Sequence, residues 1–144
     1  MERINTFLHA RAILCLRISL GIVFFWFGIL KLFNASPVIS IIEKALPPLL
    51  GESQLFMFIL AFVEMLIGVA LLANRFVKLA AGVMIVHLLV ATGSVLFTQG
   101  FTPRFPMLSL AGEFVMKNLV LVAAGFVLIS EKDEKESDKD IKKN

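Results

Sequence analysis

Side chains that carry redox or metal chemistry are scarce in this sequence. Its 144 residues include one cysteine, Cys15, and two histidines, His9 and His87. A single cysteine excludes an intrachain disulfide and a Cys-x-x-Cys relay, so the chain does not belong with the small four-helix thiol oxidases. His9 lies before the first apolar run, which leaves one histidine where bis-histidine ligation of a haem needs two. The sequence therefore supports no metal site.

Apolar residues, in contrast, make up 58% of the chain, and the mean hydropathy is +0.89. A soluble domain has about 45–50% apolar residues, and its core could not bury the surplus. The apolar residues form four long runs, at 12–33, 54–73, 77–97 and 107–130. Each run reaches the roughly 20 residues that cross about 30 Å of hydrocarbon as a helix. The sequence predicts an all-α fold, an integral membrane four-helix bundle formed by residues 1–130.

The segments outside the runs predict two further features. In the first outer loop, Ser36 and Pro37 have the order of a helix N-cap and first turn, and the apolar-rich stretch VISIIEKAL follows. We expect a short interfacial helix there. From residue 131 the sequence EKDEKESDKDIKKN has interleaved charges and no aromatic residue. Residues 131–144 are therefore expected to form a disordered charged cytoplasmic tail.

The distribution of basic residues predicts how the chain lies in the membrane. With four spans, the termini and the short turn near residue 75 share one side. Nine lysines and arginines belong to that side, and only Lys44, Arg104 and, as a third, Lys31 belong to the other. The positive-inside rule then places both termini in the cytoplasm. These flanking residues account for the basic character of the chain, so the expected partner is the lipid bilayer and not a nucleic acid. The nine are Arg3, Arg11, Arg75, Lys78, Lys132, Lys135, Lys139, Lys142 and Lys143.

Ionisable residues lie near the middle of three of the predicted spans. Glu64 and His87 fall at the centres of the second and third runs, and Lys117 lies within a few ångströms of the centre of the fourth. A charged side chain in the bilayer interior costs several kcal/mol and is rarely kept without a partner or a function. We expect Glu64 to pair with Lys117, with His87 alongside. Glu113, one turn before Lys117, is the alternative partner of that lysine.

Small residues line up with these polar groups, which predicts that the polar groups face the bundle interior. Glycines in such a stripe let a neighbouring helix approach closely. Lys31 is expected to extend to the outer interface by snorkelling. The polar cluster is either a functional cavity or a set of ion pairs that only fixes helix register. The stripe on the first run consists of Arg17, Gly21, Phe24, Gly28 and Lys31. The candidate cluster consists of Arg17, Glu64, His87, Glu113 and Lys117.

Three segments of the sequence carry a family resemblance: RISLGIVFFWFGILKLF at 17–33, FVEMLIGVALLANR at 62–75 and FPMLSLAGEFVMKNLVLVAAGFVLI at 105–129. They are similar to the DoxX-like family of small four-helix membrane proteins, and most closely to its YkgB-type branch, which is associated with reactive chlorine resistance. The resemblance covers all four helices and includes the costly charges in the membrane. The matched positions are Arg17, Gly28, Lys31, Glu64, Gly68, Gly112 and Lys117.

The resemblance implies a four-helix bundle in a bacterial-type inner membrane. Founding members of the family are small subunits of quinone-linked oxidoreductase complexes, and other members are linked to oxidative-stress defence. No agreed catalytic residues come with the family, so none is carried over. Glu113 stands where the branch commonly has a basic residue and Asn118 where it commonly has an acid, so no substrate is carried over either.

These observations lead to three hypotheses of function. In the first, the chain is a subunit or accessory of a quinone-linked redox or oxidative-stress system, and Glu64, His87 and Lys117 hydrogen-bond a quinone or pass protons to it. Electrons would then come from a partner protein or a bound cofactor, because the chain has no evident redox centre of its own. The chain is then more readily a non-catalytic or partner-dependent subunit than an enzyme by itself. The alternatives are a small proton-coupled transporter and a structural or assembly subunit. The substrate, the partner and the oligomeric state, including a homo-oligomer, stay open.

Overall fold

The computed structural model describes residues 2–36, 39, 54–99 and 109–141. These residues form four helices and no strand, named α1 (Glu2–Leu32), α4 (Gln54–Leu72), α5 (Val77–Gln99) and α6 (Leu110–Ile141). Each helix contains a segment long and apolar enough to cross a membrane. The predicted all-α membrane bundle with four spans is confirmed. The expected interfacial helix of the first outer loop lies outside the described residues.

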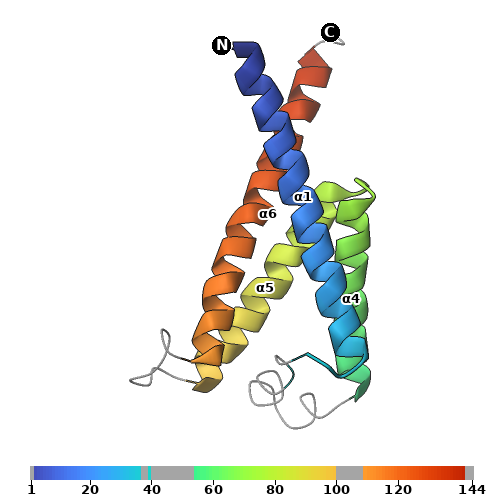
Figure 1. Cartoon of the computed structure of the whole chain (residues 1–144), viewed down its shortest axis with the longest axis vertical. Helices are drawn as coiled ribbons and strands as arrows, with labels where there is room; N and C mark the ends of the chain where they lie inside the picture. The colour runs from blue at the N-terminus through green and yellow to red at the C-terminus, as the bar shows by residue number, and fades with distance from the viewer. Residues whose placement is uncertain (1, 37–38, 40–53, 100–108, 142–144) are drawn as a thin grey trace.

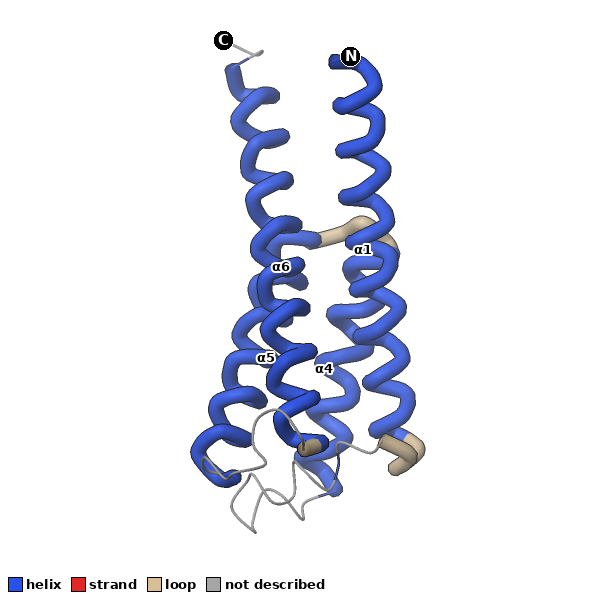
Figure 2. The backbone as a smooth tube through the Cα atoms, turned by 60° about the vertical axis from the view of Figure 1, so that its left-hand side comes forward, coloured by secondary structure: helices blue, strands red, loops and turns tan. Residues whose placement is uncertain are grey.

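The helices are arranged as two antiparallel hairpins, α1 with α4 and α5 with α6 (Figure 1). Both termini lie at one end of the bundle, which we call the termini end, and the ends of α1 and α6 project there beyond the turn that joins α4 to α5 (Figure 2). Of the four helix pairs that pack against each other, α1 and α6 do so least. The bundle is therefore tight within each hairpin and looser between them.

Glycines bring α1 and α4 into backbone contact, as the predicted stripe requires. A Cβ atom on Gly68 would lie 2.5 Å from the backbone nitrogen of Phe25, and one on Gly28 would lie 2.6 Å from the carbonyl oxygen of Ala61. Gly21 packs against Gly68 and Leu72 in the same way. Small residues at such a crossing replace the hydrophobic driving force, which is absent between helices in lipid, with close van der Waals contact.

The apolar core that joins all four helices lies in the half of the bundle near the α4–α5 turn. It includes Phe24 of α1, Leu71 of α4, Met84 of α5 and Leu128 of α6, all nearly inaccessible. A second apolar cluster, around Val95, lies toward the end of the bundle opposite the termini, which we call the far end. Only α5 and α6 contribute to it. The hairpins thus separate where the core stops, and the space between them becomes available for a site.

Two asparagines end the helices of the first hairpin. Asn34 and Asn74 both have a φ of 55°, the left-handed conformation that asparagine tolerates better than most residues. After α4, the N–H of Arg75 donates to the carbonyl of Ala70 and the N–H of Asn74 donates to that of Leu71, which is the Schellman pattern of a helix end. The same pattern ends α1, where the N–H of Ala35 donates to the carbonyl of Leu30 and the N–H of Asn34 donates to that of Lys31. These caps fix where Lys31 can lie.

The C-terminal segment differs from the expectation of a disordered tail, since α6 continues to Ile141. Glu131, the last residue of the membrane-spanning segment of α6, is buried and contacts His9 of α1 at 2.7 Å. The residues that follow are rich in lysine and glutamate, which are good helix formers and permit opposite charges one turn apart. Charge composition alone argued for disorder, whereas helix propensity and the anchored start favour continuation of the helix.

Candidate intramembrane binding site

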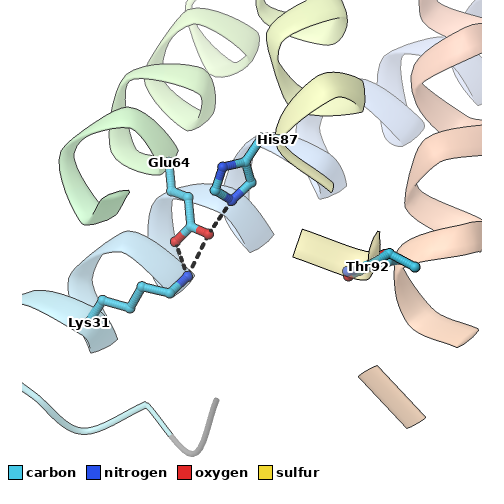
Figure 3. A network of polar contacts seen from close by, with 5 residues as sticks. Lys31, Glu64, His87 and Thr92 are labelled. Atoms are coloured by element: carbon cyan, nitrogen blue, oxygen red, sulfur yellow. Dashed lines mark hydrogen bonds and ion pairs between the residues drawn. The ribbon is translucent and has the colours of Figure 1, made fainter. Parts of the chain in front are cut away.

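The centre of the site is a buried contact between Lys31 of α1, Glu64 of α4 and His87 of α5 (Figure 3). The Lys31 ammonium donates to both carboxylate oxygens of Glu64, and Nε2 of His87 lies 2.9 Å from Oε1 of the same carboxylate. The side chains of Lys31 and Glu64 are 6% and 5% exposed, and that of His87 is 14% exposed. Three helices from both hairpins therefore meet at one carboxylate.

Charge balance explains how this cluster is tolerated in the membrane. A charge in the bilayer interior is costly unless an opposite charge and hydrogen bonds compensate it. The Lys31 and Glu64 charges cancel, and a neutral His87 with its proton on Nε2 can donate to Glu64 without adding a charge. The ring of Phe24 packs edge-on against His87, with centroids 6.5 Å apart. The cluster is neutral overall and held in place by packing.

Lys31 reaches Glu64 because of the register between α1 and α4. Gly28 packs against Ala61 and Met65, so Lys31 lies nearly one turn farther along than Glu64. A lysine side chain is long enough to turn back over that distance. The prediction that Lys31 extends to the outer interface is therefore wrong, since the side chain turns inward to the carboxylate.

The predicted pairing of Glu64 with Lys117 is also wrong. Lys117 contacts Glu113 on its own helix at 3.1 Å, and these side chains are 59% and 64% exposed. Asn118 lies opposite Thr92, and Gly125 opposite Met84. This register brings about residue 123 of α6 to the level of His87, so Lys117 lies about 9 Å nearer the far end at about 1.5 Å per residue. The prediction took the midpoint of each apolar run as a common level and therefore placed Lys117 beside His87. It was wrong because α6 is shifted along α5.

Arg17, the remaining candidate, lies near the termini end and not in the cluster. Its guanidinium donates to the carbonyls of Leu71 and Leu72, in the last turn of α4. Carbonyls in the last turn of a helix lack the usual partner four residues on and can accept further hydrogen bonds, and a cation also complements the negative end of the helix dipole. A cavity of about 280 Å³ beside Arg17 extends to Glu131. Arg17 thus caps α4 and stabilises the fold at a distance from the carboxylate.

A pocket of about 760 Å³ opens between the two hairpins and includes residues of all four helices. Its walls are mostly apolar. Lys31, Glu64 and His87 lie on its lining, and Glu113, Lys117 and Asn118 contribute a second polar group from α6. The amide of Asn118 is buried and donates to the hydroxyl of Thr92 at 3.0 Å. The pocket places two polar groups within one apolar space.

The sequence reasoning missed the Asn118–Thr92 contact and gave Lys31 no place in the cluster. A signal for Lys31 was present, because it lies on the same stripe as Gly28, whose close contact with α4 brings the lysine near Glu64. No periodic signal marked Thr92, whose contact depends on the relative shift of α5 and α6. The free-energy cost of placing a neutral polar residue at a helix contact in the membrane is too small to mark that residue in a sequence.

Four membrane-spanning helices around an interior pocket with a buried ion pair define a small multi-pass membrane protein. The model of the DoxX family matches residues 12–100, more than half of the chain, and the chain belongs to the DoxX family. No curated protein and no solved structure matches the chain. The matched residues include Lys31, Glu64 and His87, whereas the Glu113–Lys117 pair lies beyond them.

Proposed function

We propose that this chain is a membrane subunit of a quinone-linked redox or oxidative-stress system, and that it binds a quinone head group in the pocket between the hairpins. The observation that carries the proposal is the buried Lys31–Glu64–His87 cluster on the wall of a large, mostly apolar pocket. Small-molecule sites in proteins typically have about 300–1,000 Å³ and a few polar groups among apolar walls. The pocket has both properties.

The donors and acceptors of the cluster suit a ring with two carbonyl oxygens. An ammonium has three N–H groups, and Lys31 directs two hydrogen bonds at Glu64, so one N–H remains for a ligand oxygen. Nε2 of His87 is engaged by Glu64, which leaves Nδ1 as the second ring nitrogen that can exchange a proton. Phe27 lines the pocket, is 38% exposed and offers apolar surface to a flat ring.

The residues of the chain would supply positioning and proton transfer. A quinone takes up two electrons and two protons, and the electrons would come from a partner redox protein. His87 can take a proton from the head group at Nδ1 as it passes the one on Nε2 to the carboxylate of Glu64, and the reverse transfer returns a proton to the head group. The cluster therefore supports proton exchange between a head group and the protein.

A small transporter is the competing function, and the size of the pocket removes one objection to it, namely that four helices enclose little space. The composition of the walls still favours the quinone. A hydrophilic substrate needs several polar partners to replace its water, whereas most of this lining is apolar. An amphipathic ligand with one polar group fits the lining better.

The test is the substitution His87→Phe in cells that lack the native copy, with His9→Phe as the matched control. His87 lines the pocket, whereas His9 contacts Glu131 near the termini end. We expect both variants to accumulate to native levels in the membrane. His87→Phe should lose protection against hypochlorous acid, and His9→Phe should keep it.

Full protection by His87→Phe at native abundance would contradict a role of this histidine in proton exchange. If Glu64→Gln also protected fully, the quinone hypothesis should be replaced by that of a structural subunit. Loss of protection by His9→Phe alone would move the functional site to the termini end.

A further inference from the structure

The pocket continues into the seam between α1 and α6, and the spacing of the helices shows which residues line that seam. His9 of α1 contacts Glu131 of α6, so these two side chains mark the facing sides of the helices. Phe27 lies about five turns after His9, and Glu113 about five turns before Glu131, at about 3.6 residues per turn. Both residues also line the pocket. The seam and the pocket therefore share a surface.

Side chains along this seam face both the pocket and the outside of the bundle. Val120 lies about three turns before Glu131 on the same side of α6, at about 3.6 residues per turn. It lines the pocket and yet is 68% exposed. Trp26 of α1, also on the lining, is more than half exposed. An apolar molecule dissolved in the bilayer can thus reach the pocket here without crossing a layer of packed side chains.

The opposite seam, between α4 and α5, is closed more firmly. A short turn joins these helices, and the contact between Glu64 and His87 holds them together at the level of the cluster. The α1–α6 seam has no such connection at that level among the described residues, since the contact between His9 and Glu131 lies near the termini end. The two seams are therefore unequal at the level of the cluster, where α1–α6 is the more open one.

We infer that the α1–α6 seam is the lateral entrance of the pocket, and that the ligand is a molecule with a hydrogen-bonding head and an apolar tail that remains in the seam. The inference rests on the proposed function and specifies its ligand class. A space of about 760 Å³ is large enough for a ring and the first part of a tail, and the apolar side chains along the seam, Phe27 and Val120 among them, suit the rest of the tail.

The Glu113–Lys117 pair fits this entrance. Both side chains line the pocket and are more than half exposed within a membrane-spanning helix. Such exposure is costly in hydrocarbon unless a polar group covers the charges. The head of an amphipathic ligand provides that cover as it passes from the bilayer to Lys31 and Glu64. The pair is therefore assigned to the recognition of the head at the entrance.

The test measures ligand binding by the fluorescence of Trp26, which is the only tryptophan in the chain and lies on the pocket lining. The full chain is reconstituted in phospholipid nanodiscs and titrated with a para-benzoquinone that carries a decyl chain. We expect saturable quenching by the native protein. Val120→Phe should raise the half-saturating concentration about tenfold, because the added ring occupies the path of the tail.

Val86→Phe is the matched control. Val86 lies on α5 and is 62% exposed, close to the 68% of Val120, but it neither lines the pocket nor belongs to the α1–α6 seam. It should leave the half-saturating concentration within about twofold of the native value. Val120→Ala, which widens the entrance, should bind at least as tightly as the native protein. If Val120→Phe impairs folding, Val120→Ala still tests whether the seam is the entrance.

The outcomes separate the entrance from the proposed function. Saturable binding that Val120→Phe leaves unchanged, or that Val86→Phe weakens as much, would overturn the assignment of the seam while the pocket remains a quinone site. Weaker binding by Val120→Ala would also overturn it. The absence of saturable quenching in the native protein would overturn the proposed function itself.

Discussion

Glu64 is the residue on which the site depends, because it has a partner in each hairpin. Lys31 compensates its charge from α1, and His87 approaches it from α5. The carboxylate is 5% exposed, so bulk water contributes little to its stability. Removal of one member of a buried ion pair leaves the other charge without compensation, which costs about 3–5 kcal/mol in folded proteins.

We therefore predict strong coupling between Lys31 and Glu64. Lys31→Met and Glu64→Gln should each lower the thermal midpoint in mild detergent, by an amount equivalent to about 3–5 kcal/mol. The double variant should be more stable than the sum of the two losses implies, because it leaves no unpaired charge. Additive losses would show that the two side chains do not interact.

Lys117→Met is the control for the stability measurements on Lys31 and Glu64. Lys117 contacts Glu113 within one helix, and both side chains are largely exposed. Because Lys117 does not contact Glu64, the losses of Lys117→Met and Glu64→Gln should add in the double variant. A double variant more stable than that sum would restore Lys117 as the partner of Glu64.

The sequence indicated which residues were costly but not which ones meet. Glu64 and His87 could be identified from the sequence because an ionisable residue near the middle of an apolar run is costly and is rarely kept without a partner or a function. Lys31 stands near the end of its run, and the inward turn of its side chain is decided by the contact of Gly28 with α4. Depth along a run does not contain that information, because each helix is shifted relative to its neighbours.

At the scale of the helices, the contact between α1 and α4 determines the geometry of the site. The backbones meet at Gly68, where a Cβ would lie 2.5 Å from the nitrogen of Phe25 and 2.8 Å from the carbonyl oxygen of Gly21. Backbone atoms cannot move aside as a flexible side chain can. Any larger residue there must separate the helices, and Lys31 would then move away from Glu64.

Gly68→Ala is accordingly predicted to destabilise the bundle by about 1–3 kcal/mol, the usual range for overpacking, and to weaken quinone binding. The effect can be measured by thermal unfolding and by the quenching of Trp26. The matched control is Gly82→Ala on α5, where an added Cβ meets nothing within 4 Å.

Gly82→Ala should be neutral or stabilise the protein by about 0.5–1 kcal/mol, because alanine is the better helix former. Equal losses in the two variants would show that glycine is needed for some reason other than the close approach of α1 and α4. A neutral Gly68→Ala would contradict the packing of the first hairpin directly.

The helices could be predicted from hydropathy because a run of about 20 apolar residues has few alternatives. Their ends could not be predicted as well. Asn34 and Asn74 end α1 and α4 by local hydrogen bonds that leave no mark in the hydropathy. The continuation of α6 to Ile141 depends on helix propensity and on the contact of Glu131 with His9, and charge composition pointed the other way.

At the scale of the whole molecule, the termini lie together at one end of a four-helix bundle (Figure 1). An even number of spans requires this arrangement whichever way the protein is inserted. The bias of basic residues toward the termini end supports a cytoplasmic location for both termini. The pocket would then open toward the outer half of the membrane.

Reporter fusions test this orientation. Fusions after Asn34, Asn74, Gly100 and Asn144 should alternate between outside, inside, outside and inside, because basic residues near the ends of the spans are retained in the cytoplasm. An external C-terminus with four spans would invert the protein and place the pocket in the cytoplasmic half of the membrane.

We propose that the Lys31–Glu64–His87 cluster binds the head group of a quinone, and infrared difference spectroscopy can detect this contact at the carbonyl oxygens themselves. A quinone with isotope-labelled carbonyls is bound to the protein in nanodiscs, and its carbonyl stretches are compared with those of the same quinone in lipid alone. We predict that one carbonyl shifts to lower frequency, because Lys31 donates a hydrogen bond to it. The shift should disappear in the Lys31→Met/Glu64→Gln double variant, which retains a neutral cluster. Carbonyl frequencies equal to those in lipid, or a shift that persists in the double variant, would contradict the account.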